Sequence, residues 1–173
     1  MTTLEIERKN GVALGICEDT LVIYYAKAPT LESVRTIDNA TKHPAVARLN
    51  RVFALVVIDA ISRAPETEVR AAMHRSIRSQ ASRTVALAYA ILGSGFSNAA
   101  ARAVVSGILL LVRPPYPIKV FPTLPAASQW LLSQGEPRST SDSRQRPERA
   151  EQLERLNEFC FSIGAGSVPQ ATH

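Results

Sequence analysis

The sequence predicts an α/β fold built on a mixed β-sheet of about five to six strands. Three short β-rich runs separated by turn residues open the chain. Two later runs, residues 53–58 and 84–92, are apolar at nearly every position, as expected of strands covered on both faces. Segments with helical spacing alternate with these runs, an order typical of α/β proteins. The 173 residues, 46% of them hydrophobic, suffice for one domain with a sizeable core.

The three opening runs are residues 4–8, 12–17 and 21–26. Asn10-Gly11 and Glu18-Asp19 lie between them, and both are turn dipeptides. We therefore expect a meander of three antiparallel strands.

Four helices are expected in the body of the chain. The first follows Thr30, a favourable N-cap, and ends before Pro44. The second begins at Pro65, runs to about Gln80 and carries an apolar stripe of Val69, Met73 and Ile77. A third helix over 97–112 and a fourth over 123–134 flank a short last strand, residues 118–121.

The C-terminal part has a different composition. Residues 135–147 contain no apolar side chain and are typical of a linker. Residues 148–163 regain helical spacing through Leu153, Leu156, Cys160 and Ile163. This amphipathic helix either docks on its own domain, residues 1–134, or binds a partner or a second copy. Residues 164–173 are expected to form a flexible tail.

The charge of the chain is concentrated in the body. The net charge is +5, because residues 1–134 contribute +6 and residues 135–173 contribute −1. Arg70, His74 and Arg78 recur every four residues and would form a basic ridge on the second helix. Such a ridge is either a solvated helix face or a surface for phosphates or an acidic partner. Because no aromatic residues interleave with it, the pattern argues against nucleic-acid binding.

Neither the N-terminal residues nor the cysteines indicate export. Charged residues occupy positions 5, 7, 8 and 9, where a secretory signal would need a continuous apolar run. No apolar run reaches the length that a bilayer requires. The two cysteines are too few for a disulfide framework and are interpreted as reduced thiols. We expect a cytoplasmic protein.

The sequence contains no recognisable catalytic or metal-binding motif, and we expect no cofactor and no enzymatic activity. Gly93-Ser94-Gly95 could receive an anion at a helix start, but Asn98 replaces the next glycine of a dinucleotide fingerprint, and a simple turn is the alternative. The three histidines have no partner at metal-ligand spacing. Neither cysteine lies near a base.

Two further features raise the question of a ligand. Asp59 and Ser62 follow the central strand, where open α/β sheets place ligands, although an Asp there can also simply accept turn N–H groups. The third helix is apolar nearly all round and must be covered by another helix, a second subunit or an apolar ligand.

The order of elements resembles the STAS domain family, which includes bacterial anti-anti-sigma factors. The resemblance covers about residues 4–134. Its most telling part is similar to the SpoIIAA-like branch, in which a strand leads to a Phe and a helix ends in Trp-Leu, here Phe121 and Trp130-Leu131. The resemblance implies a mixed sheet with four helices mainly on one face. It also implies a non-enzymatic module that binds a protein partner or, in related domains, a nucleotide or lipid.

The chain departs from the family at the phosphorylated switch. The family has an Asp-Ser-Ser/Thr-Gly-like sequence after the central strand, whereas Ser62 here is followed by Arg63 and Pro65. We therefore keep the fold and expect an interaction or regulatory module without that switch. Its candidate partner-binding residues are Asp59, Ser62, Arg63, Ser94, Phe96 and Ser97.

Two alternatives remain beside this hypothesis. One is a carrier or sensor of a small apolar or lipid ligand, with the third helix as one wall. The other is an enzyme of unknown class. Under each of these hypotheses we expect a homodimer, because the third helix and the tail helix offer apolar surface that a monomer must otherwise cover.

Overall fold

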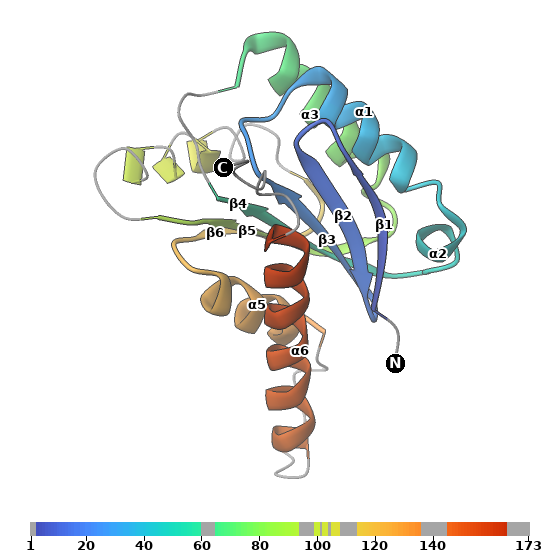
Figure 1. Cartoon of the computed structure of the whole chain (residues 1–173), viewed down its shortest axis with the longest axis vertical. Helices are drawn as coiled ribbons and strands as arrows, with labels where there is room; N and C mark the ends of the chain where they lie inside the picture. Colours follow the sequence, from blue (N-terminus) through green and yellow to red (C-terminus); the bar gives the residue numbers. More distant parts are fainter. Residues whose placement is uncertain are drawn as a thin grey trace, which may run out of the picture.

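A computed structural model describes residues 3–59, 65–93, 99–100, 102–103, 105–107, 114–135 and 145–165, with the backbone alone at 145–147, 149 and 165. In this part of the chain, six strands form one sheet in the order β1-β2-β3-β4-β5-β6 (Figure 1). The first three strands pair antiparallel, and β3 to β6 pair parallel. The predicted α/β class with a mixed sheet is confirmed.

The strands match the predicted runs to within a residue or two. Their bounds are β1 Thr3–Lys9, β2 Val12–Cys17, β3 Thr20–Tyr25, β4 Val52–Ile58, β5 Thr84–Ile91 and β6 Ile118–Phe121. The β1–β2 turn has positive φ at both central residues, 55° at Asn10 and 74° at Gly11. Two such residues are what a tight hairpin requires, and Asn-Gly adopts this conformation at low cost.

The bounds of the helices are α1 Leu31–Ala40, α2 Pro44–Ala47, α3 Thr67–Ser79, α5 Leu124–Ser133 and α6 Gln145–Ala165. The predicted helix starts are confirmed at Thr30 and Thr123, whereas α3 begins at Thr67 instead of Pro65, and α6 begins at Gln145, within the predicted linker 135–147, instead of Glu148. The side chains of Thr30 and Thr123 each accept a hydrogen bond from the backbone three residues on. Pro44 ends α1 as expected but also opens α2, a single turn that we did not predict. The described residues within 99–107 are helical, and the rest of the predicted third helix lies outside the described residues.

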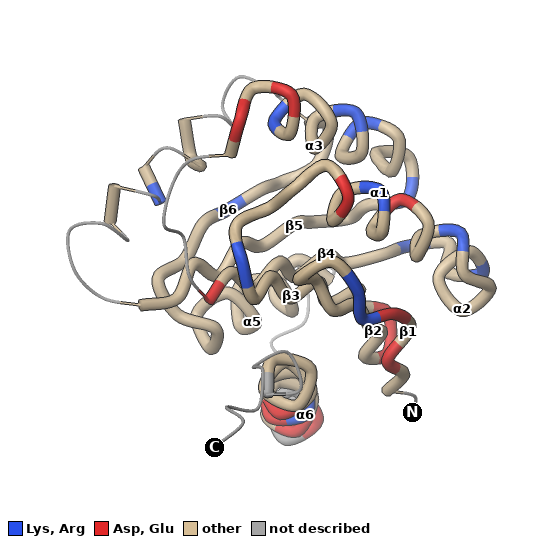
Figure 2. Tube along the Cα trace, turned by 45° about the horizontal axis from the view of Figure 1, so that its top comes forward, with Lys and Arg blue, Asp and Glu red and all other residues tan. Residues whose placement is uncertain are grey.

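The arrangement of the helices differs from the expectation of one mainly covered face. Helices α1 and α3 lie on one face of the sheet, and α5 and α6 lie on the other (Figures 1 and 2). The parallel strands follow each other in one direction, so right-handed crossovers place the connecting helices α1 and α3 on the same side. The opposite face is therefore left for the helices that follow β6.

The central strand β4 shows why both faces need a cover. Val56 and Ile58 belong to the core beneath α1 and α3, whereas Leu55 and Val57 belong to the core beneath α5 and α6. All four side chains are at most 5% exposed. The predicted central position of this strand, buried on both faces, is confirmed.

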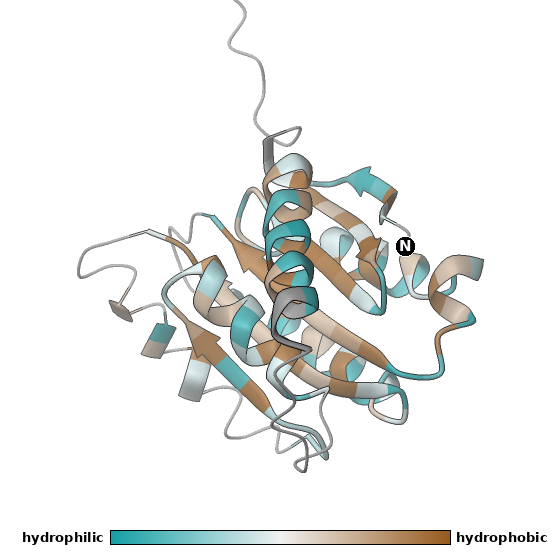
Figure 3. Ribbon diagram, turned by 90° about the horizontal axis from the view of Figure 1, so that it is seen from below, coloured by the Kyte–Doolittle hydropathy of each residue, from teal (hydrophilic) through white to brown (hydrophobic). Residues whose placement is uncertain are grey.

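Helix α6 packs on the sheet of its own chain, over β2 and β3 (Figure 3). Leu156, Cys160 and Ile163 are buried there, which is the first of the two alternatives for this helix. No helix in the described part of the chain combines the length and apolarity that crossing a membrane would take.

Two glycines allow this close packing. A Cβ at Gly15 in β2 would lie 2.5 Å from Cζ of Phe159 and 2.8 Å from Cδ1 of Ile163. A Cβ at Gly164 would lie 2.7 Å from the ring of Tyr24 on β3. Real Cβ atoms do not approach other atoms this closely, so each site excludes a larger residue unless the helix moves.

Polar contacts also hold the same helix, at its middle and at its C-terminal end. The Arg8 guanidinium donates a 2.8 Å hydrogen bond to the carbonyl of Ile163, one of the last carbonyls of α6. Arg155 contacts Glu18, the residue after β2, at 3.3 Å, and Ser128 of α5 donates to Asn157 at 2.9 Å. These contacts fix the position of a helix whose apolar face is narrow.

A first prediction concerns the central strand. Val57→Asp should abolish cooperative urea unfolding, because it buries an unpaired carboxylate at a position only 1% exposed. The exposed Asn39, changed to Asp, serves as the control and should keep the wild-type midpoint. A Val57→Asp variant with an unchanged midpoint would contradict the two-sided burial of β4.

A second prediction concerns the packing of α6 against β2. Gly15→Ala should lower the free energy of unfolding by about 1–3 kcal/mol through overpacking. It should also speed the reaction of the native protein with a thiol reagent. Burial raises the pKa of the Cys17 thiol to about 11 and that of Cys160 to about 12, so neither thiol reacts readily while α6 is docked.

Gly107→Ala is the matched control, because a Cβ there meets no atom within 4 Å. Equal thiol reactivity in the two variants would show that Gly15 does not determine the docking of α6.

Candidate functional site

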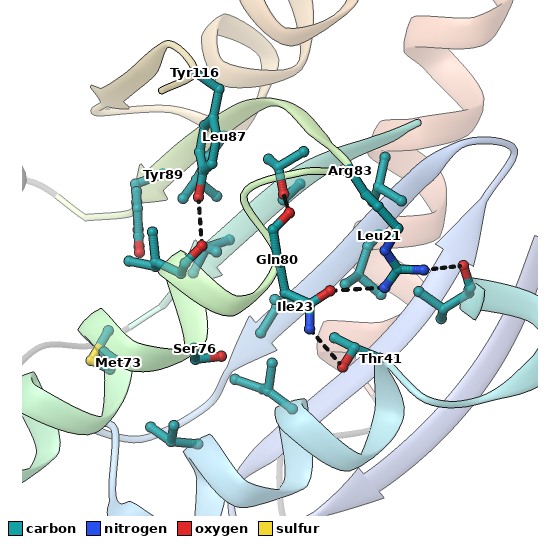
Figure 4. Close-up of a pocket in the computed structure, with 18 of the residues that line it drawn as sticks. Leu21, Ile23, Thr41, Met73, Ser76, Gln80, Arg83, Leu87, Tyr89 and Tyr116 are labelled. Atoms are coloured by element: carbon teal, nitrogen blue, oxygen red, sulfur yellow. Dashed lines mark hydrogen bonds between the residues drawn. The ribbon is translucent and has the colours of Figure 1, made fainter. Parts of the chain in front are cut away.

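A cavity lies between the sheet and the layer formed by α1, α2 and α3 (Figure 4). Its volume is about 90 Å³, and it is partly open to solvent. Since one water needs about 10–15 Å³ by this measure, the space suits roughly six waters or a small organic molecule.

The floor of the cavity is apolar and comes from three parallel strands. Successive side chains of a strand point to opposite faces, so every second residue of each strand reaches the cavity. The floor residues are Leu21, Ile23 and Tyr25 of β3, Val52, Ala54 and Val56 of β4, and Leu87 and Tyr89 of β5.

The roof is held together by polar side chains. Ser76 of α3 donates a 2.5 Å hydrogen bond to Asp38 of α1, and Gln80 donates to Thr41 at 3.2 Å. The Tyr116 hydroxyl donates to the carbonyl of Ile77 at 3.4 Å. These bonds hold α3 beside α1 and above the strands.

The cavity exists because α3 does not fill the space beneath it. Only Val69 of this helix is buried, and Met73 and Ile77 remain partly exposed. The next residues that face the cavity, Ser76 and Gln80, form hydrogen bonds with α1 and the residue that follows it. Below them, the small side chain of Ala54 leaves room on β4.

One end of the cavity is aromatic. Tyr89 is 4% exposed, yet its hydroxyl has no hydrogen-bond partner among the described residues. Burial raises the pKa of Tyr89 far above its usual range and raises that of Tyr116 to about 12. Both hydroxyls are therefore neutral at physiological pH, and that of Tyr89 is available to a polar atom in the cavity.

The other end is polar and cationic. The half-buried Arg83 donates to Oε1 of Gln80 at 2.8 Å and to the carbonyl of Ala47 at 3.4 Å. Within the described chain, no carboxylate lies within 4 Å of this guanidinium, and the described ion pairs involve other residues. Figure 4 shows Arg83 and Tyr89 on opposite sides of Gln80.

Of the predicted partner-binding residues, the structure describes Asp59 alone, and Asp59 does not line this cavity. Asp59 is exposed, and its backbone N–H donates to the carbonyl of Tyr25 at 3.2 Å. Burial raises the pKa of the Tyr24 hydroxyl to about 12, with a further contribution from the negative charge of Asp59. Since Tyr24 belongs to the core on the α6 side, Asp59 does not line the cavity. Outside the described residues lie Ser62, Arg63, Ser94, Phe96 and Ser97.

The predicted basic ridge is not a uniform charged surface. Arg70 turns back along its own helix and donates to the carbonyl of Pro65 at 2.7 Å and to Thr67 at 2.9 Å. His74 is half-buried, and Arg78 is exposed. Figure 2 shows Lys and Arg along α1, α2 and α3, so the exposed charge is spread over this layer.

The cavity residues were not singled out from the sequence, although β5 carried a signal. Ala86, Ala88 and Ala90 alternate with Leu87 and Tyr89, so one face of the strand is small and the other is large. The small face allows α5 to approach closely, and the large face lines the cavity.

The polar side chains that line the cavity are hydroxyls, one amide and one guanidinium, which can orient a ligand through hydrogen bonds. In the described part of the chain, no group of three or more His, Cys, Asp or Glu side chains could hold a metal ion.

A third prediction concerns the tyrosines. Burial raises the pKa of all four, Tyr24, Tyr25, Tyr89 and Tyr116. Absorbance at 295 nm should therefore stay flat as the pH passes the ordinary value of about 10. Unfolded tyrosines ionise first, so their contribution to stability is present below pH 10 and is lost as the pH rises towards 12. A tyrosinate signal with a midpoint near 10 in folded protein would contradict this burial.

Comparison with known proteins adds no assignment: no family model, no curated protein and no solved structure matches this chain.

Proposed function

We propose that this chain is a non-enzymatic binding module that holds a small, mainly apolar ligand between its sheet and α3. The observation that carries this proposal is the 90 Å³ cavity with an apolar floor. A ligand site of this kind has mainly hydrophobic walls and a few convergent polar groups. Here the polar groups are the Tyr89 hydroxyl at one end and Arg83 with Gln80 at the other.

The wall of the site differs from the one expected. The sequence suggested the third helix, residues 97–112, as a wall for an apolar ligand, and most of that segment lies outside the described residues. The described walls are α1, α2 and α3 instead. The class of ligand stays as predicted, since the floor consists of aliphatic and aromatic side chains.

The proposal is compatible with a STAS-like interaction or regulatory module. Helix α3 forms part of the roof, and it begins three residues after the segment 60–64 that contains Ser62 and Arg63. A ligand that packs against α3 could thus affect a partner that contacts this segment. The homodimer also stays a prediction, but Leu156, Cys160 and Ile163 of α6 are already buried within the chain.

The test uses 1-hexanol as a neutral probe. Titration of the full chain should shift the methyl NMR signals of Ile23 and Leu87 on the floor and of Met73 on α3. Ala54→Leu should remove these shifts while leaving the thermal midpoint equal or higher, because the added side chain fills the empty space.

The same substitution at the exposed Ala71 of α3 is the matched control and should leave the titration unchanged. Identical shifts in Ala54→Leu and in wild type, or shifts spread evenly over the protein, would place the bound hexanol elsewhere and overturn the proposal.

A further inference from the structure

We infer that the natural ligand of the cavity is an organic anion, a small monocarboxylate whose charged group pairs with Arg83 and whose apolar body lies on the floor. This inference rests on the proposed function and adds the chemical class of the ligand. It is carried by the position and the incomplete pairing of one guanidinium.

The first step is the environment of Arg83. This residue is half-buried and lines the cavity, where a charge is less well hydrated than on an open surface. A charge in such a place normally has a carboxylate partner, because pairing offsets lost hydration. In the described chain, Arg83 has only neutral oxygens, with 2.8 Å to Gln80, 3.4 Å to Ala47 and 3.5 Å to Val46.

The second step is the geometry of the contacts. The two longer hydrogen bonds leave the planar guanidinium with donor capacity, and Arg binds carboxylates through two parallel N–H groups. Gln80 and Thr41 lie at the same end of the cavity, joined by a 3.2 Å hydrogen bond. A carboxylate placed there would meet donors from both Arg83 and Gln80.

The third step is the separation of polar and apolar walls. Leu21, Val52 and Leu87 on the floor offer no polar side-chain atom to a ligand. An anion without an apolar body would leave this surface in contact with water, and a neutral apolar molecule would leave Arg83 without an ionic partner. A ligand with a charged group and an apolar body would both pair with Arg83 and cover the apolar floor.

The size of the cavity limits the length of the ligand. A volume of about 90 Å³, which is room for roughly six waters, accommodates a body of a few carbon atoms. Short aliphatic or small aromatic monocarboxylates fit this limit, whereas a long-chain fatty acid does not.

The test compares hexanoate, 1-hexanol and acetate on the full chain by the same methyl NMR titration at low ionic strength. Hexanoate should bind at least tenfold more tightly than hexanol, since only its charged group pairs with Arg83. Acetate should cause no shift of the floor methyl groups, because it lacks an apolar body. Binding of hexanol tests the proposed function. The ratio of the affinities for hexanoate and hexanol tests this inference.

Arg83→Gln keeps hydrogen-bond donors and removes the charge. It should weaken hexanoate about tenfold and leave hexanol within twofold of wild type. Arg83→Lys keeps the charge and should retain a preference for hexanoate, which separates loss of pairing from damage to the fold. Arg48→Gln, an exposed position at the end of α2 that does not line the cavity, should change neither affinity.

Three outcomes would overturn the inference. Equal affinity for hexanoate and hexanol would be consistent with an apolar binding cavity but would contradict an anionic group on the ligand. An equal loss of both ligands in Arg83→Gln would make Arg83 a structural residue only. Absence of binding by any probe would overturn the proposed function together with the inference.

Discussion

The fold depends on one constraint: the central strands are apolar on both faces, so each face of the sheet must be covered. The crossovers between the parallel strands cover one face, because they share one handedness and one direction along the sheet. Among the described residues, the other face is covered by the helices that follow β6, namely α5 and α6. The C-terminal helix is therefore part of the core, and burial of Leu156 and Ile163 contributes about 1.5–3 kcal/mol each.

The two faces meet this constraint in different ways. On the α6 side the contact residues are small, with Gly15 in β2, Ala88 and Ala90 in β5 and Gly164 in α6, so helix and sheet approach closely. On the α3 side the strands carry Leu87 and Tyr89, while the helix is held by hydrogen bonds of Ser76 and Gln80. Close packing thus fills one face, and a cavity remains on the other.

Much of the fold could be predicted from the sequence, because strands and caps are local signals. The apolar run of β4 and the N-caps Thr30 and Thr123 are examples. The single turn of α2 was missed because Pro44 was interpreted only as a stop. The cavity was missed for a different reason: the spacing of Val69, Met73 and Ile77 shows that α3 has an apolar stripe, but not how far that stripe lies from the sheet.

The loosely packed face has a consequence for the proposed binding of a ligand. Helix α3 buries Val69 alone among its side chains, and hydrogen bonds of Ser76 and Ile77 also hold its C-terminal end. A ligand beneath Met73 and Ile77 would add apolar contacts to these partly exposed side chains, and it would therefore favour one position of the helix. The effect would extend along α3 to its N-terminal end at Thr67. A charged group on the ligand would add a second attachment at Arg83, which follows the C-terminal end of the helix, so both ends of the roof would respond to the same molecule.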